Sequence, residues 1–167
     1  MMIEILKLTY SNAEQYAELV KKIHIAEEQI KFASTPEDFL LDVCETTHLH
    51  IIKFDGDVIG FFKLDTNYHS SYRFCPETAI GLRSFAIDKG QQGKGLGTKI
   101  VKALFSYLKT YYVNIREIYL TVNYKNLGAK ACYEKGGFEC LNEKYLGGDA
   151  GPQRIPVTIQ DAKFSKL

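Results

Sequence analysis

The length of 167 residues predicts one domain over residues 1–167, long enough to bury an α/β core. Hydrophobic residues make up 46% of the chain and charged residues 25%, as in a water-soluble globular protein. The net charge of +1 excludes a general nucleic-acid binder. No apolar run approaches the roughly 18 residues that span a bilayer, and the start lacks a signal-peptide pattern. We therefore expect a cytoplasmic protein with no nucleic-acid or membrane partner.

Charge is distributed unevenly along the chain. Residues 1–50 contain nine acids and four lysines, whereas residues 89–112 contain five lysines and no acid. A cationic substrate that meets an anionic cofactor would suit this division. A solvated acidic helix face explains the first part more simply.

The first 65 residues alternate between strand and helix signals. Thr35-Pro36 is a helix start with a capping hydroxyl and a proline at the first helical position. The turn Asp55-Gly56 joins two apolar runs into a β-hairpin. The predicted elements are a strand at 3–8, a helix at about 12–24, a helix near 36–45, and hairpin strands at 49–54 and 57–64.

Two kinds of potential metal ligand occur in the sequence, and neither has the spacing of a site. His48 and His50 share one face of a strand without a third ligand nearby, so we expect exposed strand histidines and no metal. The four cysteines form no C-x-x-C pair, so we expect reduced core thiols. These are Cys44, Cys75, Cys132 and Cys140.

A glycine-rich stretch follows the apolar strand predicted at 81–87. Gly93, Gly95 and Gly97 have no Cβ and can adopt positive φ, so backbone N–H groups can converge on an anion. The next helix, with an apolar stripe from Leu96 to Tyr112, adds its unpaired first-turn N–H groups. The spacing fits neither a Walker A loop nor a dinucleotide fingerprint. The stretch is therefore predicted to be a phosphate-binding loop or a simple turn at the start of a helix.

The remaining segments complete an α/β pattern. The polar, aromatic loop at 66–78 is a candidate wall of a substrate pocket. The predicted elements after Tyr112 are a strand at 117–122, a helix at 126–135 capped by Gly136-Gly137, an extended segment at 138–141, a turn at 147–152 and a strand at 156–159. A homodimer contact through the 147–152 turn and the last strand is one further expectation.

Two motifs together resemble the GNAT family of N-acetyltransferases. The glycine loop contains Gln92-x-x-Gly95-x-Gly97, and the later helix contains N-x-x-A-x-x-x-Y-x-x-x-G-F. The resemblance covers about residues 48–141. It implies an α/β (α+β) fold with a mixed, mostly antiparallel sheet of about six to seven strands and about four flanking helices. It also implies that the strands at 81–87 and 117–122 splay apart. The residues of the second motif are Asn126, Ala129, Tyr133, Gly137 and Phe138.

The resemblance implies an acetyl-CoA-dependent acyltransferase that acetylates a primary amine, expected to be that of a small molecule. Carried over, the strand backbone would bind pantetheine, the glycine loop would bind the pyrophosphate, and Tyr133 would protonate the departing thiolate. The implied cofactor-binding residues are Phe85, Ala86, Ile87, Gln92, Gly93, Lys94, Gly95, Leu96, Gly97, Thr98, Asn126, Ala129 and Lys130.

The sequence leaves several alternatives for the general base and for the acceptor amine. Arg83 stands where many relatives carry an acid, so either a water relay or one of Glu28, Glu45, Asp65 and Glu77 would take the proton. Arg83 itself would pair with an acid or bind a substrate carboxylate. Likeness to bacterial spermine/spermidine acetyltransferases in Ile25–Phe32, Val58–Phe61 and Phe85–Gly97 makes a polyamine one candidate acceptor. The alternatives are a protein N-terminus, an aminoacyl-tRNA, and a non-catalytic acetyl-CoA-binding module.

Overall fold

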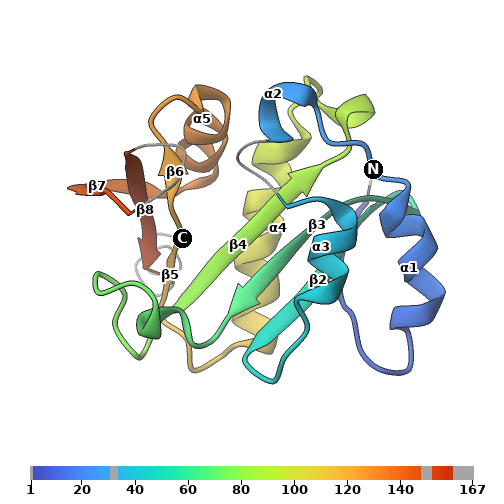
Figure 1. The fold of residues 1–167 in the computed structure, drawn as a ribbon, viewed down its shortest axis with the longest axis horizontal. Helices are drawn as coiled ribbons and strands as arrows, with labels where there is room; N and C mark the ends of the chain where they lie inside the picture. Colours follow the sequence, from blue (N-terminus) through green and yellow to red (C-terminus); the bar gives the residue numbers. More distant parts are fainter. Residues whose placement is uncertain (1, 31–33, 148–151, 160–167) are drawn as a thin grey trace.

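The computed structural model describes residues 2–30, 34–147 and 152–159. Within them the chain forms an eight-stranded sheet with helices on both faces (Figure 1). The strands are β1 (Ile3–Lys7), β2 (Thr47–Phe54), β3 (Asp57–Asp65), β4 (Ile80–Ile87), β5 (Glu117–Tyr119), β6 (Val122–Asn123), β7 (Glu139–Tyr145) and β8 (Gln153–Ile159). The helices are α1 (Ala13–Lys21), α2 (Glu27–Ile30), α3 (Pro36–Leu41), α4 (Leu96–Tyr111) and α5 (Leu127–Gly136), with 3₁₀ turns at Tyr68–Ser70 and Lys89–Gln91.

The sheet is mixed and mostly antiparallel, as predicted. Its order is β1-β2-β3-β4-β5-β8-β6, with β7 paired to β8. Among the described strands, only β4 and β5 pair in parallel. Helix α4 follows β4 and returns the chain to the edge of the sheet where β4 began, so β5 runs in the same direction. The strand predicted at 117–122 is divided into β5 and β6.

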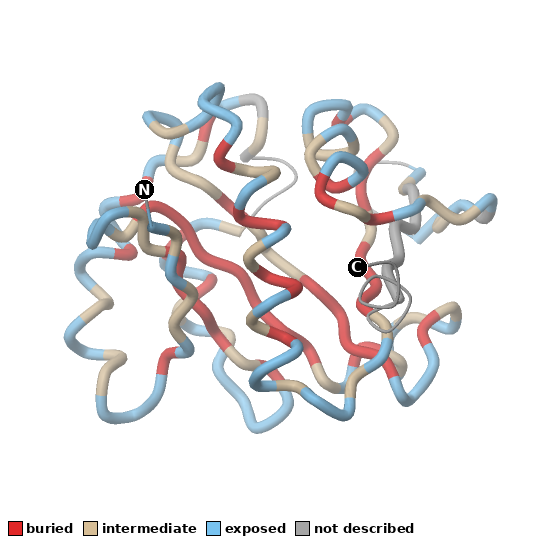
Figure 2. The backbone as a smooth tube through the Cα atoms, turned by 180° about the vertical axis from the view of Figure 1, so that it is seen from behind, coloured by how far each residue is buried: buried red, intermediate tan, exposed pale blue. Residues whose placement is uncertain are grey.

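Two hydrophobic cores hold the layers together. Helix α4 buries Ile100, Leu104 and Leu108 against one face of the sheet. Helices α1 and α3 cover the other face, where Phe39 of α3 stacks on Phe61 of β3 with ring centroids 4.2 Å apart. Figure 2 shows the central strands as a buried layer between exposed helix surfaces. The central strands are therefore apolar on both faces, which places their backbone in the interior.

Most element boundaries agree with the sequence prediction. The hairpin forms as expected, and the Thr35 hydroxyl accepts a hydrogen bond from the Asp38 N–H at 3.1 Å. Helix α1 ends at Lys21 and α3 at Leu41, both earlier than predicted, and α2 was not anticipated. The early end of α3 turns Asp42 towards the sheet, where it pairs with Lys63. The turn predicted at 147–152 lies largely outside the described residues, so the dimer contact expected there does too.

The expectation of exposed strand histidines is wrong for His50. Its side chain is fully buried between Phe62 and Tyr107 of α4, and its ring stacks on Phe62 at 4.9 Å. His48 is half-buried. The reason is that helices cover both faces of β2, so alternation along the strand does not direct either face to solvent.

The expectation of core thiols holds only in part. All four cysteines are free, but Cys75 alone is fully buried. Cys132 and Cys140 are half-buried, and Cys44 is exposed in the turn that precedes β2. Hydrogen bonds from the Thr46 and Thr47 side chains lower the pKa of the Cys44 thiol to about 7.

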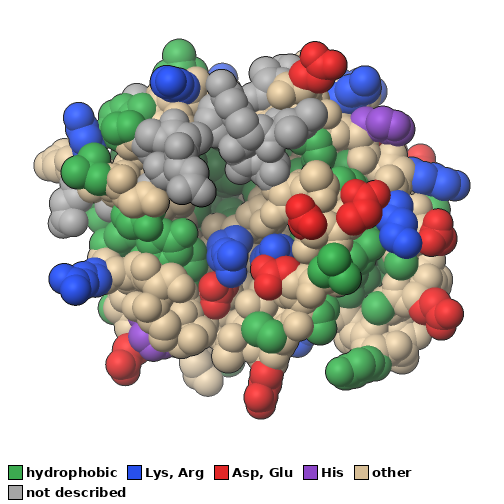
Figure 3. All heavy atoms as spheres, viewed as in Figure 1, with side chains coloured by type: hydrophobic (Ala, Val, Ile, Leu, Met, Phe, Trp, Pro, Cys, Tyr) green, Lys and Arg blue, Asp and Glu red, His purple; other side chains and the backbone are tan. Residues whose placement is uncertain are grey.

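Surface charge on the face that carries α1 and α3 is mixed. Figure 3 shows acidic and basic side chains interspersed there with apolar ones, without a large patch of one sign. On this face the acids belong to a solvated surface of mixed charge, which agrees with the simpler explanation of the acidic N-terminal residues. Within the described ranges, no helix combines the length and the apolar character needed to cross a bilayer.

Candidate active site

A cavity opens where β4 and β5 separate. The two strands pair only at Ile80–Ile118 and Gly81–Tyr119, after which they diverge. On its far side β5 pairs with β8, so β8 holds β5 and β6 away from β4 (Figure 1). The resulting cavity has a volume of about 720 Å³ and is lined by the second half of β4, the glycine loop and α5. This volume is within the range of small-molecule and cofactor sites.

The glycine loop closes one end of the cavity. Gly93 and Gly95 have φ of 79° and 73°, and a Cβ added at either position would meet no atom within 4 Å. The Gln92 side chain donates to the Ile87 carbonyl oxygen at 3.1 Å, which ties the loop to the end of β4. Gly95 is the N-cap of α4, whose first turn contains no acid. Open backbone at a helix N-terminus fits the pyrophosphate of coenzyme A.

Asn126 joins the start of α5 to α2 across the cavity. Its Oδ1 accepts a hydrogen bond from the Ala129 N–H at 3.2 Å and thereby caps α5. Its Nδ2 donates to Gln29 Oε1 at 3.1 Å, and Gln29 Nε2 donates back to Asn126 Oδ1 at 3.3 Å. Both side chains line the cavity. The amide pair therefore connects α2 in the N-terminal region to the start of α5.

Tyr133 lies on α5 two helical turns beyond Asn126 and one turn beyond Ala129. Its ring packs edge-on against Phe85 of β4 and against Phe138, with centroids 5.8 and 5.5 Å apart. Burial raises the pKa of its hydroxyl well above the ordinary value, and the neighbouring Cys132 thiol adds to the rise. Within the described residues the hydroxyl has no protein hydrogen-bond partner. The raised pKa keeps the phenol protonated, so the cavity wall carries a hydroxyl that can serve as a hydrogen-bond and proton donor.

A β-bulge in β4 shapes the middle of the cavity. Phe61 pairs with Ala86 but Lys63 pairs with Arg83, so Ser84 and Phe85 together face the single residue between them on β3. Ser84 has a φ of 55°, which is uncommon for a residue other than glycine. The Ser84 hydroxyl is 2.7 Å from the Ser34 hydroxyl. The bulge turns backbone polar groups of β4 out of the sheet ladder beside the cavity.

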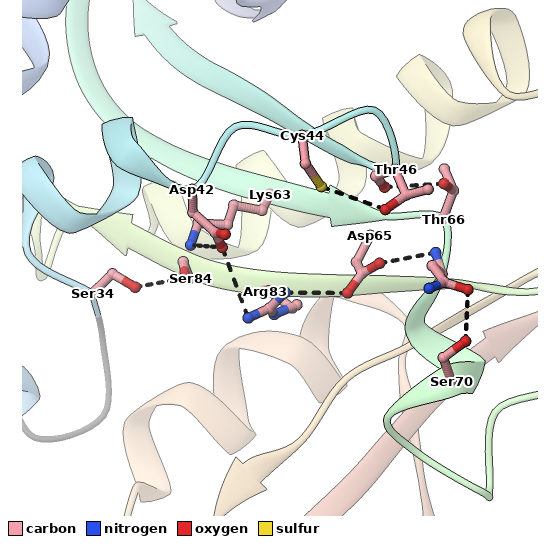
Figure 4. A network of polar contacts seen from close by, with 11 residues as sticks. Ser34, Asp42, Cys44, Thr46, Lys63, Asp65, Thr66, Ser70, Arg83 and Ser84 are labelled. Atoms are coloured by element: carbon pink, nitrogen blue, oxygen red, sulfur yellow. Dashed lines mark hydrogen bonds and ion pairs between the residues drawn. The ribbon is translucent and has the colours of Figure 1, made fainter.

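The other end of the cavity is aromatic and charged. Tyr68 and Tyr72, from the loop predicted as a pocket wall, line it and stack at 4.2 Å. Arg83 also lines it, and Arg83 Nη1 donates to Asp65 Oδ2 at 3.1 Å. Figure 4 shows Arg83 between Asp65 and Asp42, with Asp42 also held by Lys63. The arginine is thus fixed in place by acids on both sides.

The structure brings nearly all the predicted site residues together. Two of them do not line the cavity: Lys94 donates to Gln91 at 3.5 Å, and Lys130 pairs with Glu134 on α5 at 2.9 Å. The predicted residues that line it are Phe85, Ala86, Ile87, Gln92, Gly93, Gly95, Leu96, Gly97, Thr98, Asn126, Ala129 and Tyr133.

The candidate bases do not join this group. Glu45 and Glu77 are exposed and away from the cavity, and Asp65 is buried behind Arg83. The side chain of Glu28 is outside the described part of the structure. No carboxylate is among the described residues that line the cavity.

Sequence reasoning missed Gln29 and the Ser84 bulge. Gln29 is 97 residues from its partner Asn126, and no local pattern signals that contact. The β4 bulge likewise depends on the register with β3. The sequence hint was that Gln29 lies within Ile25–Phe32, one of the stretches similar to spermine/spermidine acetyltransferases.

A glycine loop with open backbone at a helix N-terminus, a cleft between splayed strands and a buried phenol on its wall fit an acyl-CoA transferase site. The Acetyltransferase (GNAT) family model matches residues 13–138, so the chain belongs to the GNAT acetyltransferase family. It is an acetyl-CoA-dependent N-acetyltransferase, and acetyl-CoA is its cosubstrate.

Individual relatives agree with this assignment. The chain is 30% identical over 151 residues to the uncharacterized N-acetyltransferase YbbJ of Bacillus subtilis (strain 168), covering 87% of this chain and 92% of the relative. It is 28% identical over 131 residues to the spermine/spermidine N(1)-acetyltransferase of the same strain, covering 76% and 84%. Its fold is similar to that of the aminoglycoside acetyltransferase AAC(6')-Ib with coenzyme A and kanamycin, at a TM-score of 0.75, 22% identity and 98% coverage of both chains.

Proposed function

We propose that the chain acetylates a primary amine of a small molecule, with Tyr133 as the proton donor. Acetyl-CoA supplies the acetyl group as an activated thioester. In the transfer, a bond forms between the amine nitrogen and the acetyl carbon and the carbon–sulfur bond breaks. One proton leaves the amine for water, the Tyr133 hydroxyl gives its proton to the sulfur, and the tyrosinate takes a proton back from water before the next turnover. The single observation that carries the proposal is the buried Tyr133 on the wall of the cleft between β4 and β5.

Different groups of cavity residues would hold different parts of acetyl-CoA. The backbone of Phe85 to Ile87 would hold the pantetheine arm, and the loop from Gln92 to Thr98 would hold the pyrophosphate. Asn126 and Ala129 would flank the arm from α5. Lys94, which is exposed, and Lys130, which is partly exposed and paired with Glu134, would add positive charge near the phosphates. The four free thiols support the proposed cytoplasmic location.

Tyr133→Phe tests the role of the hydroxyl. The variant keeps the ring that packs on Phe85 and Phe138, so the fold and the affinity for coenzyme A should change little. Loss of one general acid should lower kcat by about 10²–10⁴-fold. Thiol release from acetyl-CoA with a panel of amines measures turnover, and calorimetry measures coenzyme A binding.

Tyr119→Phe is the matched control, because Tyr119 is also buried but does not line the cavity. Its kcat should stay close to that of the parent chain. Equal turnover in the Tyr133 variant and the parent would remove Tyr133 from the mechanism. A chain that binds coenzyme A yet releases no thiol with any amine would contradict the proposed small-molecule acceptor.

A polyamine is the second candidate acceptor. It is favoured by two relatives, named as a probable spermine N(1)-acetyltransferase and a spermine/spermidine N(1)-acetyltransferase, at 29% and 28% identity. The nine acids of residues 1–50 also suit a cation. Spermine and spermidine therefore belong in the amine panel beside amino acids and aminoglycosides.

A further inference from the structure

We infer that the acceptor carries a carboxylate as well as the amine, and that Arg83 selects it by binding this carboxylate. The inference rests on the proposed function and names a narrower class of acceptor for the same site. It begins from the charges on the cavity wall. Among the described lining residues, the two charged side chains are Arg83 and Lys135, both cationic. A cavity wall of this sign favours an anionic group on the ligand and disfavours a polycation.

The acids near Arg83 are already neutralised. Asp65 is 7% exposed and accepts from Arg83 at 3.1 Å, and Asp42 meets the Lys63 ammonium at 2.6 Å. The cluster therefore has two negative and two positive charges and offers no uncompensated carboxylate to a substrate ammonium. Neither acid lines the cavity. A second cationic amine on the substrate would find no free counter-ion among these residues.

Two acids orient the Arg83 guanidinium and leave it able to bind a ligand. Lys63 and Arg83 are direct partners in the β3–β4 register, an arrangement that is unfavourable unless acids separate the two charges. Asp42 and Asp65 do this, and they orient the guanidinium from two sides (Figure 4). Its bond to Asp65 uses one of five N–H donors, and it makes no other hydrogen bond to the described residues. The Arg83 side chain is 39% exposed. Oriented donors facing a cavity suit a planar carboxylate.

The position of Arg83 also limits the size of the acceptor. Arg83 and Phe85, which packs on Tyr133, are two residues apart on β4 with the Ser84 bulge between them, and both line the cavity. The carboxylate would therefore lie a few bonds from the reacting amine. Tyr72, half-buried beside Arg83, would pack against the carbon chain between the two groups. Amino acids with a side-chain amine, or short ω-amino acids, have this form.

The test compares pairs of amines that differ only by the carboxylate. Suitable pairs are ornithine with putrescine, lysine with cadaverine, and 4-aminobutyrate with butylamine, with spermidine as the polyamine reference. Thiol release gives kcat/KM for each. We expect the carboxylate-bearing member to be preferred by at least about 10-fold, because a site built to bind a polar group rejects the analogue that lacks it. In Arg83→Gln this ratio should fall towards one, mainly through KM, and Arg83→Lys should restore it only in part.

Arg73→Gln is the matched control, because Arg73 is exposed on the adjacent loop and does not line the cavity, so the ratio should stay at the parent value. The parent chain alone can overturn the inference, whether or not the Arg83 variants fold. Preference for putrescine, cadaverine or spermidine over the carboxylated partner would overturn it and leave the proposed function standing. Coenzyme A binding without thiol release from any amine would instead contradict the proposed function, and the inference with it.

Discussion

The buried Lys63 ammonium is stabilised by its ion pair with Asp42. The residue is 3% exposed in the middle of β3, and its ammonium meets the Asp42 carboxylate at 2.6 Å. Nothing in the strand sequence identifies this lysine as buried, because lysine is almost always at the surface. It is tolerated because α3 ends at Leu41 and turns Asp42 towards it.

Asp42→Asn removes this negative charge while keeping the shape of the side chain. We expect the free energy of unfolding to fall by about 2 kcal/mol, less than the 3–5 kcal/mol of fully buried pairs because Asp42 is partly exposed. Urea denaturation followed by circular dichroism measures the change. Glu4→Gln, at the exposed pair with Lys53, is the control and should cost no more than about 0.5 kcal/mol. Similar losses in both variants would mean that burial of Lys63 is not what makes Asp42 important.

The crossing of α4 and α5 depends on a glycine. A Cβ at Gly97 would lie 2.7 Å from the Cys132 sulfur and 3.9 Å from its Cβ, so the two helices approach closely beside the cavity. The family motif in the sequence explains Gly97 only as part of an anion-binding loop. The structure shows that it has a second role in packing, whereas Gly93 and Gly95 serve the loop conformation.

Gly97→Ala should lower the free energy of unfolding by about 1–3 kcal/mol, the usual cost of overpacking. Cys132→Ala in the same chain removes the sulfur that the new methyl group meets, so the double variant should recover most of the loss. Gly128→Ala is the control: its Cβ would meet nothing within 4 Å in α5, and the change should stabilise the helix by about 0.5–1 kcal/mol. Simple additivity of the Gly97 and Cys132 changes would show that the two side chains do not meet.

In the whole molecule, His50 links the sheet to α4. Its Nδ1–H donates to the His48 carbonyl oxygen at 3.0 Å, so its Nε2 accepts from the Tyr107 hydroxyl at 2.9 Å. Burial lowers the pKa of His50 from 6.5 to about 3. The folded protein therefore keeps His50 neutral at pH values at which the unfolded chain binds a proton.

Stability should consequently fall as the pH drops below 6.5 towards 3, by up to about 1.4 kcal/mol per pH unit from this group. Above pH 6.5 its contribution is complete and constant. Thermal unfolding between pH 7.5 and 5 should show this slope in the parent chain and a smaller one in His50→Gln. Some slope remains because burial also lowers the pKa of His48. An unchanged slope in His50→Gln would contradict the assignment.

Much of the fold could be predicted because its signals are local. The Asp55-Gly56 turn, the Thr35 cap and the left-handed Gly137 at the end of α5 each depend on a few adjacent residues, and each occurs as predicted. The exposure of His50 was predicted wrongly for the opposite reason. Period-two alternation reveals the two faces of a strand, but it does not reveal that helices cover both.

Sequence spacing was sufficient to identify the family and to predict most of the residues that gather around the cavity. The glycine loop and the Asn126–Phe138 motif are short, and their geometry follows from a helix start and from helical periodicity. Other contacts at the cavity are made across the fold: Gln29 with Asn126, 97 residues apart, and Arg83 with Asp65, 18 residues apart. Sheet register, the β4 bulge and the end point of α3 determine those contacts. The charge on the cavity wall is therefore a property of the packed molecule, because each side chain is oriented by neighbours distant in the chain.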